Sequence, residues 1–502
     1  TVETDGSRVV SVSDGILRVV DARSHEVTGR LDLTMYAGAG SAQLLLAGDR
    51  LLVILGDPTP NVYGGPIYSR PYPTGGARTS LFLLVDLAGP LSVISTLHPH
   101  GGYVDARMVD GTARLVVSST PTIAFPAARG SDSDGQRLAR NREIVARAPL
   151  TAWLPTYEVT TGTTTAAHTV PCTAVSHPKT YTGASMLTVY TVHLADGLDQ
   201  PEPITIAADG TEVYGSTKSL YVASSDGNRT HLHHFDTSGP GRPTYLGSAT
   251  VPGQLFDSYS MSQYDNSLRV VTTSYTDDQT TSLRVLDEAT LRITGMVGRL
   301  GAGERLHAVR FLGPLAYVVT FRSVDPLYVL DLHDPTHPRR SAELTMTGYS
   351  DYLHPVGPGR LLGVGESVNS NGIVNGLQIS LFDSSSAQHT RRLAHLTRAN
   401  TPSESPIDPH AFLYWPAAKL AILPINSWNG NESGAALVVR VGDIGLRTVG
   451  TIRNPAVSTT DGYDSGITRT LVIGDDIWTM SSSGMQVSDL TTLDRRAWVL
   501  FT

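Results

Sequence analysis

Two arginines and two histidines have the types and placement best suited to ligand binding. Arg107 lies in the stretch VDARM, Arg310 in AVRFLG, His354 in YLHP and His410 in DPHAF. We expect all four on the innermost strands of repeated β units, where they would line a shared central channel. A guanidinium group there could hold an anionic ligand through paired hydrogen bonds. These four side chains are therefore the predicted ligand-binding residues.

A structural role is the alternative for the two arginines. Asp105, Glu304 and Asp351 lie near them in the sequence, and a buried arginine is normally paired with an acid. Such ion pairs would join one β unit to the next without binding a ligand.

The spacing of other histidines is compatible with metal binding. In HLHHF, His231 and His233 share one strand face, so chelation of Cu or Zn is geometrically feasible, and a polar outer strand is the alternative. His98 and His100 in LHPH are expected at a turn. No third ligand is near either pair in the sequence, so we predict no metal site there.

Calcium is the one cofactor that the sequence leaves open. The polar loops NSWNGNESG and DGYDSG could offer carboxylate and carbonyl oxygens to Ca²⁺. Neither loop matches an ordered calcium-binding motif.

Catalytic motifs are scarce. Asp105, Asp325 and Asp351 could supply the acid pair of a glycan hydrolase, but Asp325 precedes Pro326, and this dipeptide is typical of a turn between strands. The chain contains no G-x-S-x-G serine elbow and no phosphate-binding glycine loop. We therefore predict no catalytic residue.

Composition excludes several classes of function. The net charge of −8 argues against binding nucleic acid, which requires a basic surface. No apolar run reaches the length of about 18 residues that a transmembrane helix needs. Cys172 is the only cysteine, so no intrachain disulfide can form, and we expect it to be a small core residue. The start at TVETDG, without Met, suggests a mature product whose targeting segment is absent.

A repeat positions the candidate residues. Short β-rich runs recur along the chain, and many end in an aspartate that could close the following turn with its carboxylate. These strand-ending residues are Asp21, Asp86, Asp236, Asp287, Asp331, Asp383, Asp443 and Asp489, with His193 in the same place in one further run. From Asp236 on, the gaps of 51, 44, 52, 60 and 46 residues are close to the period of propeller blades.

The repeats predict an all-β protein, a single large β-propeller of four-stranded antiparallel blades over residues 1–502. We count nine units, which start near residues 1, 41, 102, 210, 257, 306, 351, 408 and 466. Eight blades is the alternative, because typical propellers have four to eight. The first and last units each supply four strands, so the ring would close without a shared strand.

One insertion interrupts the third unit, over residues 118–185. Within it, GQRLARNREIVARAP predicts a short helix from the spacing of Leu138, Ile144 and Val145. The insertion could be a packed decoration, a lid over one face or an element that docks a partner.

Several stretches resemble the secreted C-terminal β-propeller domain family of actinobacteria, which is distantly related to WD40 repeats. The most specific stretch is residues 303–365, including GERLHAVRFLGPLAYVVTFRSVDPLYVLDLHDPTHP and GYSDYLHPVGPGRLLGVGES, and VETDG, LQISLFD and DPHAFLYWP also match. The resemblance implies a propeller fold, export to the cell surface or beyond, and often an N-terminal lipid anchor. It implies no catalytic activity.

We therefore expect a non-catalytic, exported propeller that binds a protein or a surface polymer at the cell envelope. Two other classes stay open. One is an extracellular propeller enzyme, either a glycan hydrolase or lyase or a metal-dependent oxidoreductase. The other is a structural subunit of a surface assembly.

Overall fold

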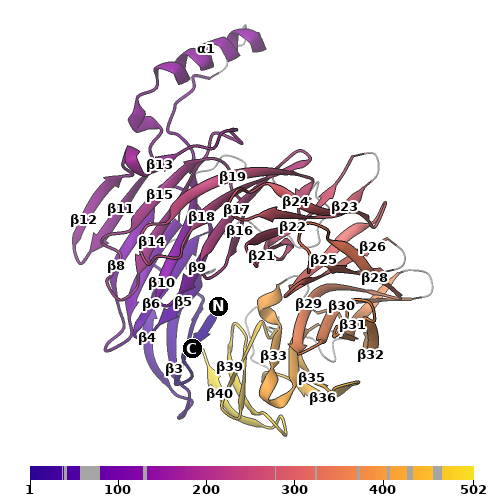
Figure 1. The fold of residues 1–502 in the computed structure, drawn as a ribbon. Coiled ribbons are helices and arrows are strands. Elements are labelled where there is room, and N and C mark those ends of the chain that lie inside the picture. Colours follow the sequence, from indigo (N-terminus) through magenta and orange to yellow (C-terminus); the bar gives the residue numbers. More distant parts are fainter. Residues whose placement is uncertain are drawn as a thin grey trace.

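Nine sheets, each built on four antiparallel strands, form the blades of a β-propeller in this computed structural model (Figure 1). The structure describes residues 1–36, 38, 42–56, 80–127, 133–276, 279–322, 325–369, 373–403, 408–426, 434–455 and 466–501. Nearly all of NSWNGNESG and DGYDSG, the two loops considered for Ca²⁺, lies outside these residues. No helix in the described ranges is long and apolar enough to cross a membrane.

The first four blades follow the chain in order. Blade one contains β1 (Val2–Thr4), β2 (Arg8–Ser13), β3 (Ile16–Asp21) and β4 (Val27–Asp32). Blade two contains β5 (Gln43–Ala47), β6 (Arg50–Gly56), β7 (Ser80–Asp86) and β8 (Ser92–Pro99). Blade three contains β9 (Gly102–Val109), β10 (Thr112–Ser119), β14 (Met186–His193) and β15 (Glu202–Ala207). Blade four contains β16 (Glu212–Gly215), β17 (Ser219–Asp226), β18 (Arg229–Asp236) and β19 (Thr244–Pro252).

The remaining five blades complete the ring. Blade five contains β20 (Gln254–Leu255) and β21 (Met261–Tyr264), which both pair with β22 (Ser267–Ser274), then β23 (Thr280–Asp287) and β24 (Ile293–Leu300). Blade six contains β25 (Arg305–Leu312), β26 (Leu315–Phe321), β27 (Asp325–Asp331) and β28 (Arg339–Met346). Blade seven contains β29 (Tyr349–Gly357), β30 (Arg360–Val368), β31 (Val374–Asp383) and β32 (Arg391–Ala399). Blade eight contains β33 (Leu413–Trp415), β34 (Leu420–Ile425), β35 (Ala435–Val441) and β36 (Leu446–Ile452), and blade nine contains β37 (Arg469–Ile473), β38 (Asp476–Met480), β39 (Gly484–Asp489) and β40 (Arg495–Leu500).

Apolar side chains fill the space between neighbouring blades, so the middle strands of each blade are buried on both faces. The first and last blades also meet through apolar side chains where the ring closes. Val9 and Val20 of blade one pack with Trp478, Met480 and Val487 of blade nine. Each of these two blades takes all four strands from one end of the chain, which confirms closure without a shared strand.

The recurrent aspartate closes a turn in seven of the eight predicted places. In each case its carboxylate accepts a hydrogen bond from a backbone N–H two or three residues later, as an Asx turn requires. These residues are Asp21, Asp86, Asp236, Asp287, Asp331, Asp383 and Asp489. Asp443 differs, because its carboxylate pairs with Nζ of Lys419 at 2.9 Å. Asp325 begins β27, and the turn before it lies outside the described residues.

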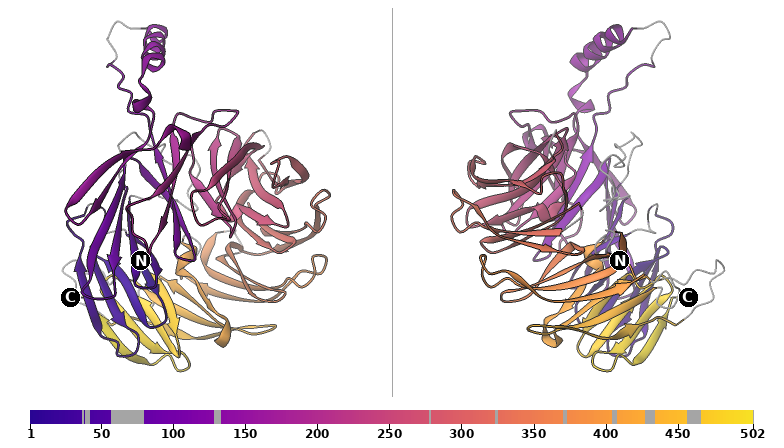
Figure 2. Two further views of the ribbon diagram at one scale, coloured as in Figure 1. Left: turned by 60° about the vertical axis from the view of Figure 1, so that its left-hand side comes forward. Right: turned by 90° about the vertical axis from the view of Figure 1, so that its right-hand side faces the viewer.

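The insertion leaves blade three after β10 and returns at β14. The helix that the sequence predicts is present as α1 (Asp134–Arg147). It begins at a capping box formed by Ser133 and Gln136, yet none of its residues is buried. Figure 2 shows α1 standing clear of the blades. The strands β11 (Thr156–Thr161) and β12 (Thr164–Thr169) instead extend the outer edge of blade two, and β13 (Val175–Ser176) pairs with β15. The hairpin β11–β12 is therefore packed on the propeller, as one of the three alternatives for the insertion expects, whereas helix α1 is not packed on it.

Candidate binding cavity beside Arg310

Three of the four predicted residues lie on inner strands: Arg107 on β9, Arg310 on β25 and His354 on β29. The expected position on a strand is wrong for His410, which lies in a 3₁₀ turn (Pro409–Ala411) before β33. Asp408 caps this turn by accepting the backbone N–H of His410 at 3.0 Å, and Pro409 occupies its first position. Both residues favour the start of a helical turn over a strand.

A cavity of about 350 Å³ opens where blades five, six and seven meet. Its wall contains Arg310, together with residues of the 3₁₀ turn Ser258–Ser260, of β25 and of β29. A cavity of this size suits a small group or one segment of a polymer.

Arg310 is the unusual charge in this wall. Its guanidinium carbon lies 5.4 Å from the centroid of the Tyr259 ring, within the range of a cation–π contact. Among the described residues it makes neither an ion pair nor a hydrogen bond. Burial raises the pKa of Tyr259, so this ring stays a neutral aromatic face. The guanidinium donors of Arg310 are therefore available to a ligand.

The acids of the same wall are each satisfied by neighbours. Asp257 accepts hydrogen bonds from the backbone N–H and the hydroxyl of Ser260, at 2.9 and 2.8 Å. Asp351 Oδ1 lies 2.7 Å from Nδ1 of His307. Glu366 accepts a hydrogen bond from the hydroxyl of Tyr349. In the described residues none of these carboxylates forms an ion pair with Arg310.

Glu366 also has an altered acidity. Burial raises the pKa of this carboxyl, and the nearby charge of Asp351 adds to the effect. A carboxyl with a raised pKa near a second carboxyl is an arrangement that acid–base hydrolysis can use. Besides Arg310, the described part of the cavity wall therefore contains a pair of carboxyl groups, Asp351 and Glu366, that could take part in acid–base chemistry.

His354 packs inside a cluster of aromatic rings. Its ring centroid lies 4.9 Å from that of Phe412, and its Nδ1 lies 3.0 Å from the Tyr352 hydroxyl. Burial, reinforced by the charge of Arg310, lowers the pKa of His354 to about 4. The neutral ring therefore acts mainly as packing between blades seven and eight.

Arg107 makes the ion pair that the sequence suggests as the alternative to ligand binding. Its Nη1 lies 2.6 Å from Asp105 Oδ1, and its Nη2 donates to the carbonyl of Val213 on β16 at 3.1 Å. Burial raises the pKa of Asp105, although the charge of Arg107 opposes the shift. This arginine joins blade three to blade four, beside a second cavity of about 230 Å³.

His410 belongs to another junction between blades. Its Nδ1 lies 3.2 Å from Asp408 Oδ1, while Asp408 Oδ2 pairs with Nη2 of Arg469 on β37 at 2.5 Å. Burial disfavours the charged form of Asp408, but the hydrogen bond from His410 and the charge of Arg469 outweigh it and hold its pKa at about 2. The His410 side chain is 83% exposed, so it remains accessible.

Two further predictions need correction. The strand with His231, His233 and His234 is buried, not a polar outer strand, and burial lowers the pKa of His233 to about 4. Cys172 is exposed instead of buried. Tyr259 and Glu366 were not singled out from the sequence, because no motif marks them: Tyr259 meets Arg310 across neighbouring blades, and Glu366 meets Tyr349 within blade seven.

Comparisons with known proteins agree with this architecture. The model of the family described as "Beta propeller domain" matches residues 1–493. An uncharacterized protein of Methanocaldococcus jannaschii is 32% identical over 50% of this chain and 37% of its own length. One of Archaeoglobus fulgidus is 37% identical over 33% of this chain and 26% of its own length. The matched regions thus span about a third of the length of these curated relatives, and both relatives are archaeal.

Solved structures with a similar fold include the dihydro-heme d1 dehydrogenase NirN, with a TM-score of 0.40 and 16% identity over 63% of this chain and 61% of that one. Another is BamB from Moraxella catarrhalis, with a TM-score of 0.34 and 10% identity over 60% of this chain and 77% of that one. Likeness at this level carries no functional argument.

Proposed function

The chain belongs to the beta propeller domain family, and on this premise we propose that it is a binding propeller that holds an acidic segment of a protein or surface polymer in the cavity beside Arg310. The observation that carries the proposal is the guanidinium group of Arg310, which lines a cavity without an acid partner among the described residues. Guanidinium groups bind carboxylate, sulfate and phosphate groups in a fixed planar geometry.

The surroundings of Arg310 favour a polymer over a free ion. Tyr259 and Tyr352 both line the cavity. Aromatic faces of this kind stack on apolar ring surfaces or on a peptide backbone, while the cation takes the charged group. A ligand that combines the two chemistries, such as an acidic sugar chain or an acidic peptide, would use both features.

We further propose that the protein acts at the cell envelope after export. The support is the resemblance of residues 303–365 and of the shorter stretches to a secreted propeller family. The experiment is to express the full-length gene product in its native host and to locate it by fractionation. Recovery from the envelope or the medium would support export, and recovery from the cytosol alone would refute it.

Hydrolysis of a glycan is the second candidate function, because Asp351 and Glu366 line the same cavity and burial raises the pKa of Glu366. One panel of assays separates the two functions. The protein is titrated with polygalacturonate, poly-L-glutamate and neutral dextran, and new reducing ends are measured in parallel. Binding to an acidic polymer without cleavage supports the binding role. Cleavage that Glu366→Gln abolishes supports the enzyme, and no binding to any acidic polymer refutes the proposed ligand class.

A further inference from the structure

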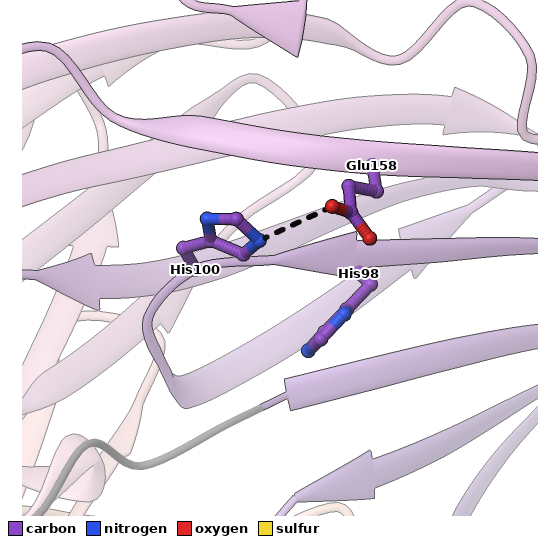
Figure 3. A group of neighbouring side chains, drawn as sticks. All are labelled: His98, His100 and Glu158. Carbon is purple, nitrogen blue, oxygen red and sulfur yellow. Dashed lines mark ion pairs between the residues drawn. The ribbon is translucent and has the colours of Figure 1, made fainter. Parts of the chain in front are cut away.

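The outer edge of blade two carries three side chains that could share a metal ion. His98 is at the end of β8, His100 follows that strand, and Glu158 is on β11 of the insertion (Figure 3). His98 and Glu158 are direct partners in the antiparallel pairing of β8 with β11. Opposite residues of such a pair project from the same face of the sheet, so the fold itself places them together.

The ligand atoms of the three side chains lie slightly farther apart than they would around a bound metal ion. One ligand atom from each side chain lies within 4.8 Å of the others, and Nε2 of His100 is 3.9 Å from Oε1 of Glu158. Ligands at zinc distances of roughly 2.0–2.1 Å and tetrahedral angles would be about 3.3 Å apart. A small movement of flexible side chains therefore closes the site, and the His100 ring and the Glu158 carboxylate already face each other (Figure 3).

Thr156 orients the His100 ring for this purpose. Its hydroxyl oxygen lies 2.8 Å from Nδ1 of His100, and its carbonyl accepts the His100 backbone N–H at 3.0 Å. When Nδ1–H donates to Thr156, Nε2 keeps the lone pair that a metal requires. Such a partner on the second ring nitrogen is the usual support of a metal-binding histidine.

The donor set selects the metal. Two imidazoles and one carboxylate suit zinc and similar transition metals, whereas Ca²⁺ and Mg²⁺ prefer oxygen ligands alone. The side chains of His100 and Glu158 are 49% and 41% exposed, so an ion can enter from solvent and keep a water ligand. We propose that His98, His100 and Glu158 bind one Zn²⁺ ion that fastens the hairpin of the insertion to blade two.

The first test is calorimetric titration of the full-length, metal-free protein with Zn²⁺. We expect one ion per chain, and at least tenfold weaker binding in each of the variants His98→Ala, His100→Ala and Glu158→Gln. Thr156→Val should weaken binding by roughly tenfold while all three ligands remain, because it removes the partner of His100. His389→Ala, which removes an exposed histidine of blade seven, is the matched control and should bind as the wild type does.

The second test does not depend on these variants folding. Crystals or frozen samples of the wild-type protein with Zn²⁺ are examined for anomalous scattering at the zinc edge. A peak between His98, His100 and Glu158 supports the site. Zinc found only elsewhere, or equal affinity in the wild type and the ligand variants, overturns it. Protease cleavage of the insertion should also slow with Zn²⁺ in the wild type and not in the three ligand variants.

Discussion

Arg310 and Tyr259 meet across the boundary between blades five and six, with the guanidinium carbon 5.4 Å from the ring centroid. This contact holds the cation at the cavity wall without neutralising its charge. An acid in the place of Tyr259 would fix the arginine equally well but would occupy its donors. The relationship therefore explains how a charge can be positioned and still remain available to a ligand.

Loss of the aromatic face should weaken both stability and binding. Tyr259→Leu removes a cation–π contact worth about 0.5–2 kcal/mol, so the free energy of unfolding should fall by roughly 1 kcal/mol. Tyr259→Phe keeps the face and is the control. Urea denaturation and titration with an acidic polymer measure the two effects, and equal behaviour of both variants would count against the contact.

Acid should open the junction between blades eight and nine. The pKa of Asp408 is lowered to about 2, so its contribution is present above the unfolded value near 4 and is lost as the pH falls from 4 to 2. Asp408→Asn should remove that pH dependence and cost about 1 kcal/mol at pH 7, a modest value because the side chain is 37% exposed. Thermal unfolding between pH 2 and 7 tests this prediction. An unchanged acid profile in the variant would contradict it.

Two buried histidines should destabilise the protein at mildly acidic pH. Burial lowers the pKa values of His233 and His354 to about 4, below the ordinary value near 6.5. Between these values the unfolded chain binds protons that the native state does not, so stability falls as the pH drops from 6.5 to 4. The double variant His233→Leu and His354→Gln should show a flatter pH profile in denaturant titrations. A profile as steep as that of the wild type would show that these rings are not the cause.

Closure of the ring depends on side-chain packing between blades one and nine, because these blades share no strand. Trp478 is 2% exposed at their interface. Trp478→Ala should therefore lower the free energy of unfolding by about 3–5 kcal/mol, which urea denaturation can measure. Leu138→Ala, on the exposed face of α1, is the control and should have an effect below about 0.5 kcal/mol.

Repetition made most of the fold predictable from the sequence. The strand-ending aspartates recur because each blade needs the same turn, and seven of them close it as expected. Local signals also placed Arg107, Arg310 and His354 on inner strands.

The candidate site was less predictable, since it depends on contacts between blades. No spacing in the sequence indicates that Tyr259 faces Arg310, or that Glu158 of the insertion faces His98. His410 shows a local effect, in which Asp408 and Pro409 start a 3₁₀ turn where a strand was expected. The His231–His234 run was misjudged because buried histidines and exposed ones look alike in sequence.

The most direct test of the account is the affinity of wild-type protein and Arg310→Gln for polygalacturonate and poly-L-glutamate at low ionic strength. Arg137→Gln, which removes the same charge from the exposed helix α1, is the matched control. We predict that an acidic polymer binds the wild type and Arg137→Gln alike, and binds Arg310→Gln at least tenfold more weakly. Equal affinity for all three proteins would contradict the claim that Arg310 receives the ligand.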